Sequence, residues 1–202
     1  MKHIYQKGFD QVGFTFVLLH GTGSNEVDIL PLADSFDQTF NVLSIRGNVN
    51  ENGALRYFRR LKEGVYDEDD LHLRGEELLT FIIEASQTYA FDIDKVVLLG
   101  FSNGSNIAIN MLLRDDNPFK YAMLLAPMYP LEPENLKEQP MLKVFLSMGK
   151  HDPIVSLDDS KHVIDLFEAR KAQVVQSWTN SHEVSAQTII DGRKWLNEIK
   201  NN

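Results

Sequence analysis

The stretch Lys95-Val-Val-Leu-Leu-Gly-Phe-Ser-Asn-Gly-Ser-Asn-Ile-Ala-Ile-Asn-Met-Leu-Leu113 decides the fold. Residues 96–99 form a short, unbroken apolar run with two valines, which is typical of a strand buried on both faces of a parallel sheet. Residues 103–114 place apolar side chains at helical spacing. Between the two parts lies Gly100-Phe-Ser-Asn-Gly104, which has the spacing G-x-S-x-G. The stretch therefore predicts a strand, a sharp turn and a helix.

A turn of this kind lifts the hydroxyl of Ser102 clear of the sheet. Gly100 and Gly104 allow the strand and the helix to approach each other without a Cβ clash. The helix that follows directs its free N–H groups and the positive end of its dipole to the same place. The pattern alone also arises by chance, and an ordinary turn serine is the alternative. The strand before it and the helix after it make Ser102 a candidate nucleophile.

The rest of the chain predicts alternating strands and helices. Strands are expected at 3–6, 15–19, 41–45, 95–99, 121–125, 143–147 and 173–177. Helices are expected at 26–36, 71–89, 103–114, 158–171 and 183–200. This alternation predicts one α/β domain over residues 1–202, with a mostly parallel, twisted sheet of about seven strands and helices on both faces. Residues 8–13 are interpreted as a turn that brings the first strand back antiparallel to the second.

Composition excludes several functions. The 29 acidic and 20 basic residues give a net charge of −9, which argues against a nucleic-acid partner. The chain has no cysteine, so it has no disulfide, no thiolate nucleophile and no cysteine-built metal site. No apolar run reaches the length of a signal peptide or a membrane span. We expect a cytoplasmic protein without stable membrane insertion.

A second motif, His20-Gly-Thr-Gly-Ser-Asn25, connects another apolar run to a helical pattern. Glycine-rich turns can bind phosphate, but this one lacks the P-loop lysine and the dinucleotide-binding spacing, and acidic residues follow it. The pattern favours an oxyanion hole formed by the backbone N–H groups of Thr22 and Asn103. His20 follows a buried strand directly and is interpreted as a structural, hydrogen-bonded histidine rather than a base.

Two later strand ends supply a candidate acid and a candidate base. Asp152 follows an apolar strand and precedes a proline, which disfavours helical geometry there. Asp158 and Asp159 are rivals, but they begin a helical pattern and are interpreted as its cap and first-turn charges. His182 lies in a loop between the last strand and the last helix. The order Ser102, Asp152, His182 is the order of the catalytic triad in α/β-hydrolases.

These residues resemble the α/β-hydrolase superfamily, and within it the small carboxylesterase/phospholipase-like branch that includes acyl-protein thioesterases. The resemblance covers nearly the whole chain and rests on His20-Gly-Thr-Gly23, Gly100-Phe-Ser-Asn-Gly104, Gly149-Lys-His-Asp-Pro-Ile-Val155 and Ser181-His-Glu-Val184. It implies an esterase or thioesterase and leaves the acyl group open. Residues 46–60 are similar to those of bacterial members associated with quinone or hydroquinone detoxification. The branch often has Gln where this chain has Asn103, a change we expect to be tolerated because the backbone N–H makes the contact.

Two connections bear on the substrate. Residues 126–140 carry four prolines and leave no room for a helical lid domain. Residues 47–70 form a long connection with six apolar side chains, namely Leu55, Tyr57, Phe58, Leu61, Val65 and Tyr66. We expect this connection to wall the site, the alternative being that it packs elsewhere on the domain. Its basic cluster of Arg56, Arg59, Arg60 and Lys62 is interpreted as solvated and compensated by the acidic residues that follow.

The sequence therefore predicts a serine hydrolase that acts on soluble short-to-medium esters or thioesters. Ser102 is the nucleophile, His182 the base and Asp152 the orienting acid. No cofactor or metal is expected, and a homodimer is possible. Four alternatives stay open. Three are enzymes: an acyl-protein thioesterase or lysophospholipase, a hydrolase linked to quinone or hydroquinone detoxification, and another hydrolase class such as a dienelactone hydrolase or peptidase. The fourth is a non-catalytic binding module.

Overall fold

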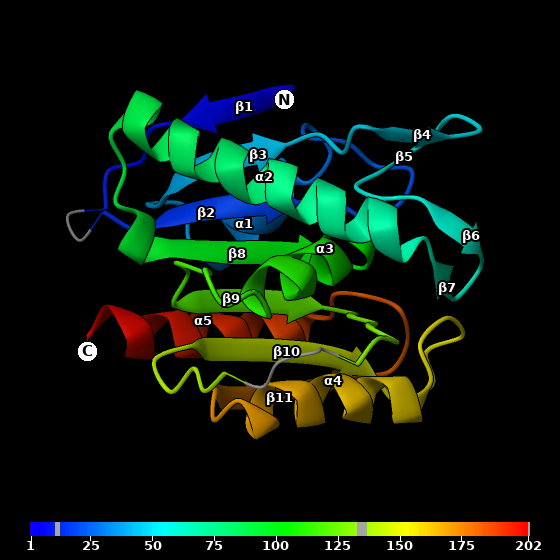
Figure 1. Ribbon diagram of the computed structural model, residues 1–202. Coiled ribbons are helices and arrows are strands. Elements are labelled where there is room, and N and C mark those ends of the chain that lie inside the picture. The colour runs from blue at the N-terminus through cyan, green and yellow to red at the C-terminus, as the bar shows by residue number, and fades with distance from the viewer. Residues whose placement is uncertain (11–12, 133–136, 202) are drawn as a thin grey trace.

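A computed structural model describes residues 1–10, 13–132 and 137–201. A seven-stranded sheet forms its centre (Figure 1). In spatial order the strands are β1 (His3–Gln6), β3 (Asn41–Ile45), β2 (Thr15–Leu19), β8 (Val96–Phe101), β9 (Tyr121–Leu125), β10 (Lys143–Gly149) and β11 (Gln173–Thr179). All neighbours pair in parallel except β1, which is antiparallel to β3. The predicted sheet of about seven mostly parallel strands is confirmed.

Strand β8 occupies the middle of the sheet, and both of its faces are covered. Val96 and Leu98 pack into a core on one face, and Val97 and Leu99 pack into a core on the other. All four side chains are fully buried. A continuous apolar run fits this position, since a strand with helices on both sides has no solvent face.

Helices cover both faces of the sheet (Figure 1). The first core joins the sheet to α2 (Glu68–Tyr89), α3 (Asn103–Leu112) and α4 (Leu157–Ala169), and the second joins it to α1 (Leu30–Phe36) and α5 (Ala186–Lys200). A short 3-10 helix, Ile93–Lys95, leads into β8. Because the strands are parallel, their carboxyl ends meet at one edge, where ligand sites of open α/β sheets lie.

The connection between β3 and α2 is built from two small hairpins. Strands β4 (Val49–Glu51) and β5 (Ala54–Arg56) form the first, and β6 (Arg60–Lys62) and β7 (Val65–Tyr66) form the second. Backbone pairing in these two hairpins satisfies part of the polar groups of this long connection, which therefore contains regular structure rather than being a plain loop.

The structure corrects two expectations at the amino-terminal end. The first strand pairs antiparallel with β3 and not with the second strand, so β1 lies at the edge of the sheet. The helix expected at 26–36 begins only at Leu30, with Pro31 in its first turn. Glu26 cannot join that helix as a solvated first-turn acid, because its carboxylate is buried against Arg46.

In the parts of the connection after β9 that the structure describes, residues 126–132 and 137–142, there is a bend and a turn but no helix, and therefore no helical lid. None of the described helices combines the length and the apolarity needed to cross a membrane.

Candidate active site

Ser102 lies on a strained turn between β8 and α3. Its backbone has φ 52° and ψ −116°, a conformation that non-glycine residues rarely adopt. A Cβ on Gly100 would lie 2.6 Å from the Ser105 nitrogen, and one on Gly104 would lie 1.9 Å from the Leu19 carbonyl oxygen. Both glycines are therefore required by close backbone approach, as the motif predicts.

The structure brings Ser102, His182 and Asp152 together. The Ser102 hydroxyl lies 3.0 Å from Nε2 of His182, and Nδ1 of His182 lies 2.7 Å from a carboxylate oxygen of Asp152. The Asp152 side chain is almost completely buried, and that of His182 is 14% exposed. With Nδ1 donating to the carboxylate, Nε2 is left as the acceptor for the serine proton. The three residues come from the ends of three strands, β8, β10 and β11.

The loop after β10 fixes the Asp152 carboxylate. Its second oxygen accepts hydrogen bonds from the backbone N–H groups of Ile154 and Val155, at 2.8 and 3.0 Å. The rivals lie elsewhere: Ser156 caps α4, and Asp159 completes its capping box. The interpretation of Asp158 and Asp159 as first-turn charges is confirmed, but neither is the cap, which is Ser156.

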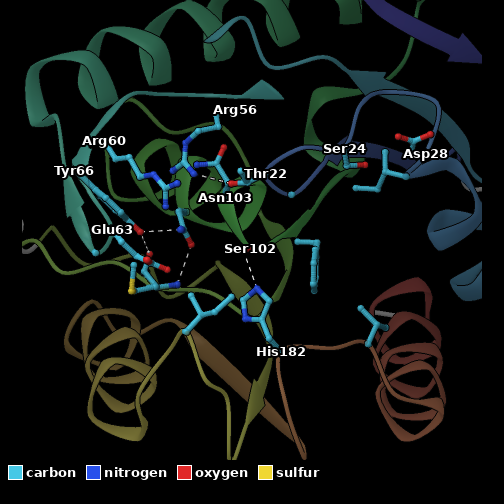
Figure 2. A pocket seen from close by; sticks show the side chains of 18 of the residues that line it. Thr22, Ser24, Asp28, Arg56, Arg60, Glu63, Tyr66, Ser102, Asn103 and His182 are labelled. Carbon is cyan, nitrogen blue, oxygen red and sulfur yellow. Dashed lines mark hydrogen bonds between the residues drawn. The ribbon is translucent and has the colours of Figure 1, made fainter. Parts of the chain in front are cut away.

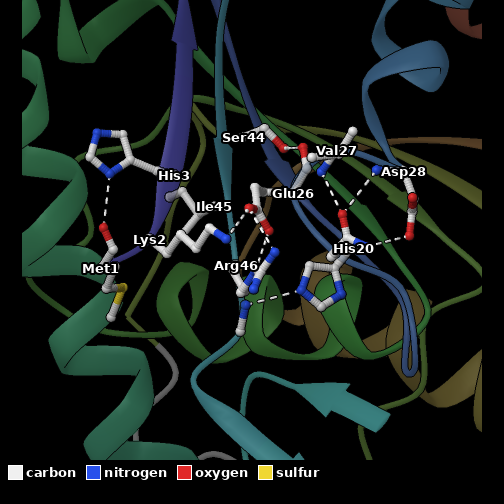
Figure 3. A network of polar contacts seen from close by, with 12 residues as sticks. Met1, Lys2, His3, His20, Glu26, Val27, Asp28, Ser44, Ile45 and Arg46 are labelled. Atoms are coloured by element: carbon white, nitrogen blue, oxygen red, sulfur yellow. Dashed lines mark hydrogen bonds and ion pairs between the residues drawn. The ribbon is translucent and has the colours of Figure 1, made fainter. Parts of the chain in front are cut away.

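His20 is a buried structural histidine, as predicted. Nε2 accepts the Gly47 N–H at 3.0 Å, and Nδ1 lies 2.8 Å from the Gly21 carbonyl oxygen, so backbone groups occupy both ring nitrogens. Figure 3 shows His20 beside the ion pair of Glu26 and Arg46. Burial lowers the pKa of His20 and outweighs the neighbouring charges. Close by, Arg46 binds the buried carboxylate of Glu26 and keeps its pKa below the ordinary value although burial opposes this.

Tyr57 ties together the loops that carry the predicted oxyanion hole. Its hydroxyl donates to the Ile45 carbonyl at 2.6 Å and accepts the His20 N–H at 3.0 Å. Its own N–H donates to the side-chain oxygen of Asn103 at 2.8 Å. The sequence carries no signal of this role, and Tyr57, which is expected in the pocket wall, is instead buried. Only the tertiary structure brings its three partners together.

A cavity of about 520 Å³ opens over Ser102 and His182 (Figure 2). Ser102, His182, Thr22 and Asn103 all line it, so every predicted site residue except the buried Asp152 faces one pocket. Apolar side chains from other elements complete the wall: Ile29, Leu32, Phe101, Met128, Ile154 and Val184. The volume suits a small organic substrate.

The 47–70 connection does wall the pocket, but mostly with charged groups. Arg56, Arg60, Glu63 and Tyr66 line it. Among the apolar residues expected there, Phe58 is buried in the core, and Leu61 is 73% exposed to solvent.

The interpretation of the basic cluster as solvated is wrong for Arg56, whose side chain is only 6% exposed. Arg59 does match that interpretation, because it is 62% exposed and paired with Asp67 and Asp70.

With this geometry established, comparison with known proteins identifies the family. The sequence model of the family described as Phospholipase/Carboxylesterase matches residues 60–198. The chain belongs to this family. It is 39% identical over 200 residues to MhqD of Bacillus subtilis (strain 168), covering 98% of both chains. The crystal structure of the Bacillus cereus carboxylesterase matches with a TM-score of 0.94 and 42% identity, covering 98% of this chain and 94% of that one.

Acyl-protein thioesterase 1 of Debaryomyces hansenii is 22% identical over 144 residues, which span 68% of this chain and 62% of that protein. Membership of the phospholipase/carboxylesterase family confirms the resemblance seen in the sequence and makes this chain a hydrolase with the α/β-hydrolase fold.

Proposed function

We propose that this protein is a serine hydrolase that cleaves carboxylic esters through an acyl-enzyme. The observation that carries the proposal is the continuous contact from Ser102 through His182 to Asp152 at the floor of the pocket. A serine hydroxyl is a weak nucleophile, and a histidine within hydrogen-bonding distance supplies the base that activates it.

In the first half of the reaction, Oγ of Ser102 attacks the ester carbonyl while its proton passes to Nε2 of His182. Asp152 stabilises the resulting imidazolium through Nδ1. The tetrahedral intermediate then collapses, and His182 returns the proton to the departing alcohol. The product of this half is an ester between Ser102 and the acyl group.

In the second half, water attacks the acyl-enzyme and loses its proton to His182. Collapse of the second tetrahedral intermediate releases the carboxylic acid and restores the Ser102 hydroxyl. In both halves the backbone N–H groups of Thr22 and Asn103 bind the oxyanion. The position of Asn103 at the first turn of α3 favours this role, because free N–H groups and the positive dipole end gather there. No step in this mechanism requires a metal or an organic cofactor.

We further propose that the substrates are soluble esters with short-to-medium acyl groups, and that the enzyme acts in the cytoplasm. The absence of a helix in the described part of the β9–β10 connection supports this choice over an interfacial lipase. A series of p-nitrophenyl esters from acetate to palmitate, assayed below and above the micelle threshold, tests it. Falling rates beyond medium chains and no jump at the threshold are expected, whereas a jump would indicate a lipase.

Thioester hydrolysis is the second candidate, favoured by the similarity to an acyl-protein thioesterase. The same residues serve both reactions, because only the leaving group changes. Matched butyryl esters of an alcohol and of a thiol distinguish the two by their kcat/KM values.

Labelling with a fluorophosphonate probe tests the nucleophile. The native protein is expected to take up one probe at Ser102, and Ser102→Ala is expected to take up none. A matched control is Ser105→Ala, because Ser105 lies in the same turn but its hydroxyl is buried against the Leu125 backbone. Labelling that survives Ser102→Ala would overturn the proposal.

A further inference from the structure

One wall of the pocket carries two arginines close to the candidate nucleophile. Arg56 and Arg60 both line the cavity, and their side chains are 6% and 31% exposed. Figure 2 shows them with Thr22 and Asn103 on one side of the pocket and His182 on the other. An arginine as buried as Arg56 is rare unless an anion is paired with it.

The protein itself supplies little anionic charge to Arg56. Its guanidinium donates to the Thr22 hydroxyl at 2.7 Å and to the Phe58 carbonyl at 3.3 Å, which are neutral acceptors. The carboxylate that pairs with it, Glu51, is 3.8 Å away. That carboxylate is bound more closely by Arg60, whose Nε lies 3.0 and 3.1 Å from its two oxygens. Two guanidinium groups thus share one carboxylate.

The electrostatics of the pair agree with this geometry. The pKa of Arg56 is lowered, first by burial and then by the positive charge of Arg60. Two other acids line the pocket, Glu63 and Asp28, and both are exposed to solvent, which screens their charges. The guanidinium of Arg56 is therefore a buried positive charge on this wall, offset only by a carboxylate that it shares with Arg60.

Arg56 also lies beside the loop of the proposed oxyanion hole. Its partner Thr22 belongs to the loop whose backbone N–H is proposed to bind the oxyanion. A group bound to Arg56 is thereby placed beside the scissile carbonyl rather than at the mouth of the cavity. A planar guanidinium binds a carboxylate through two parallel hydrogen bonds, which fixes orientation as well as charge.

We propose that Arg56, supported by Arg60, is a specificity-determining anion site, and that the preferred substrates are esters carrying a free carboxylate near the scissile bond. This inference rests on the proposed function and names its substrate class: half-esters of dicarboxylic acids, or esters of hydroxy acids. The carboxylate completes the charge pairing of Arg56 in the complex.

Two matched substrate pairs test the inference in a pH-stat assay. Monoethyl and diethyl adipate place the charge on the acyl side, and 4-acetoxybenzoate and its methyl ester place it on the alcohol side. The measured quantity is the ratio of kcat/KM for the charged ester to that for the neutral ester. Dividing the native ratio by that of a variant cancels the intrinsic reactivity of each ester. At least one pair is expected to lose roughly tenfold in this ratio in Arg56→Gln, the size typical of a hydrogen bond to a charged group.

The control variant is Arg59→Gln, which removes a neighbouring arginine that does not line the pocket; its ratio is expected to equal the native one. Arg56→Lys keeps the charge but not the planar fork, and it is expected to restore only part of the preference. Retained activity on the neutral esters shows that each variant is folded. If Arg56→Gln also lost activity on the neutral esters, a labelling assay would replace the comparison of kcat/KM ratios. In that assay the native protein is labelled at Ser102 with the fluorophosphonate probe in the presence and absence of adipate, and adipate is expected to slow the labelling.

Equal ratios in the native protein, Arg56→Gln and Arg59→Gln would overturn the anion site while leaving the serine hydrolase intact. Failure of adipate to slow labelling, where that readout is needed, would do the same. Absence of turnover on all four esters together with absence of labelling at Ser102 would instead overturn the proposed function.

Discussion

Two histidines lie past the carboxyl ends of strands, His20 after the buried β2 and His182 after the edge strand β11, but their surroundings differ. Both ring nitrogens of His20 contact backbone groups, and the side chain is completely buried. Both ring nitrogens of His182 contact side chains, Ser102 on one side and Asp152 on the other, and the ring reaches the pocket.

The difference shows what makes a histidine available for proton transfer. A ring whose two nitrogens both contact backbone groups has no free acceptor. Its hydrogen bonds stabilise the conformation of the surrounding loops instead. A ring held by a carboxylate on one nitrogen keeps the other for a substrate or nucleophile. A position after a strand places a histidine at the carboxyl edge of the sheet, and the hydrogen-bond partners of its ring nitrogens determine its role.

The largest expected effect separates the two residues by activity. His182→Ala is expected to lower kcat on a short ester by about 10⁵ to 10⁶, because the serine loses its base. His20→Gln is expected to lower it by no more than about tenfold, or ~1.4 kcal/mol of barrier. The double variant Ser102→Ala/His182→Ala is expected to be no slower than either single variant. A large loss in His20→Gln with a small one in His182→Ala would reverse the assignment.

The next effect tests the carboxylate behind His182. Asp152→Asn is expected to lower kcat by about 10⁴, because the amide no longer holds the tautomer that leaves Nε2 free. Asp158→Asn is the matched control and is expected to keep native activity. Steady-state kinetics on both variants shows which aspartate supports catalysis. An inactive Asp158→Asn together with an active Asp152→Asn would assign the acid of the triad to Asp158 in α4 instead.

A smaller effect tests the structural role of His20. His20→Gln leaves the buried Gly47 N–H or the Gly21 carbonyl without its partner, so the free energy of unfolding is expected to fall by about 1–3 kcal/mol. Urea denaturation measures it, with His3→Gln as a control on a partly buried histidine near the amino terminus. An unchanged urea midpoint would show that the two backbone contacts add nothing.

The smallest effect is a pH dependence of that difference. The folded protein holds the pKa of His20 below the value of 6.5 expected in the unfolded chain. As the pH falls through about 6.5, the unfolded chain binds a proton that the folded chain does not, so the native protein loses stability. His20→Gln lacks this contribution. The stability gap between the two is therefore expected to narrow from pH 7.5 to pH 5, and a constant gap would contradict it.

Much of the fold could be predicted because its signals are local. The apolar runs that became β2, β8 and β10 alternate with amphipathic helices, and the resulting sheet is the predicted one. The candidate triad could be predicted for the same reason, since each member lies within three residues of the end of a strand and the carboxyl edge brings strand ends together.

What could not be predicted depends on contacts between distant segments. The pairing of β1 with β3 joins segments that are distant in the sequence. So does the ion pair with Arg46, which buries Glu26 outside the helix that its position in the sequence predicts. The burial of Arg56 inside a charge-rich segment follows from two hairpins that fold over the pocket. Local charge counting treats all arginines of that segment alike, and only packing separates Arg56 from Arg59.

Trapping the acyl-enzyme tests the central claim most directly. The native protein is mixed with p-nitrophenyl acetate, quenched in acid during turnover, digested and mapped by mass spectrometry. One acetyl group is expected on the peptide that contains Ser102, present in His20→Gln at a similar level and absent from Ser102→Ala and His182→Ala. An acetyl group on any other residue that turns over at the rate of catalysis, or none on Ser102 in an active enzyme, would contradict the account.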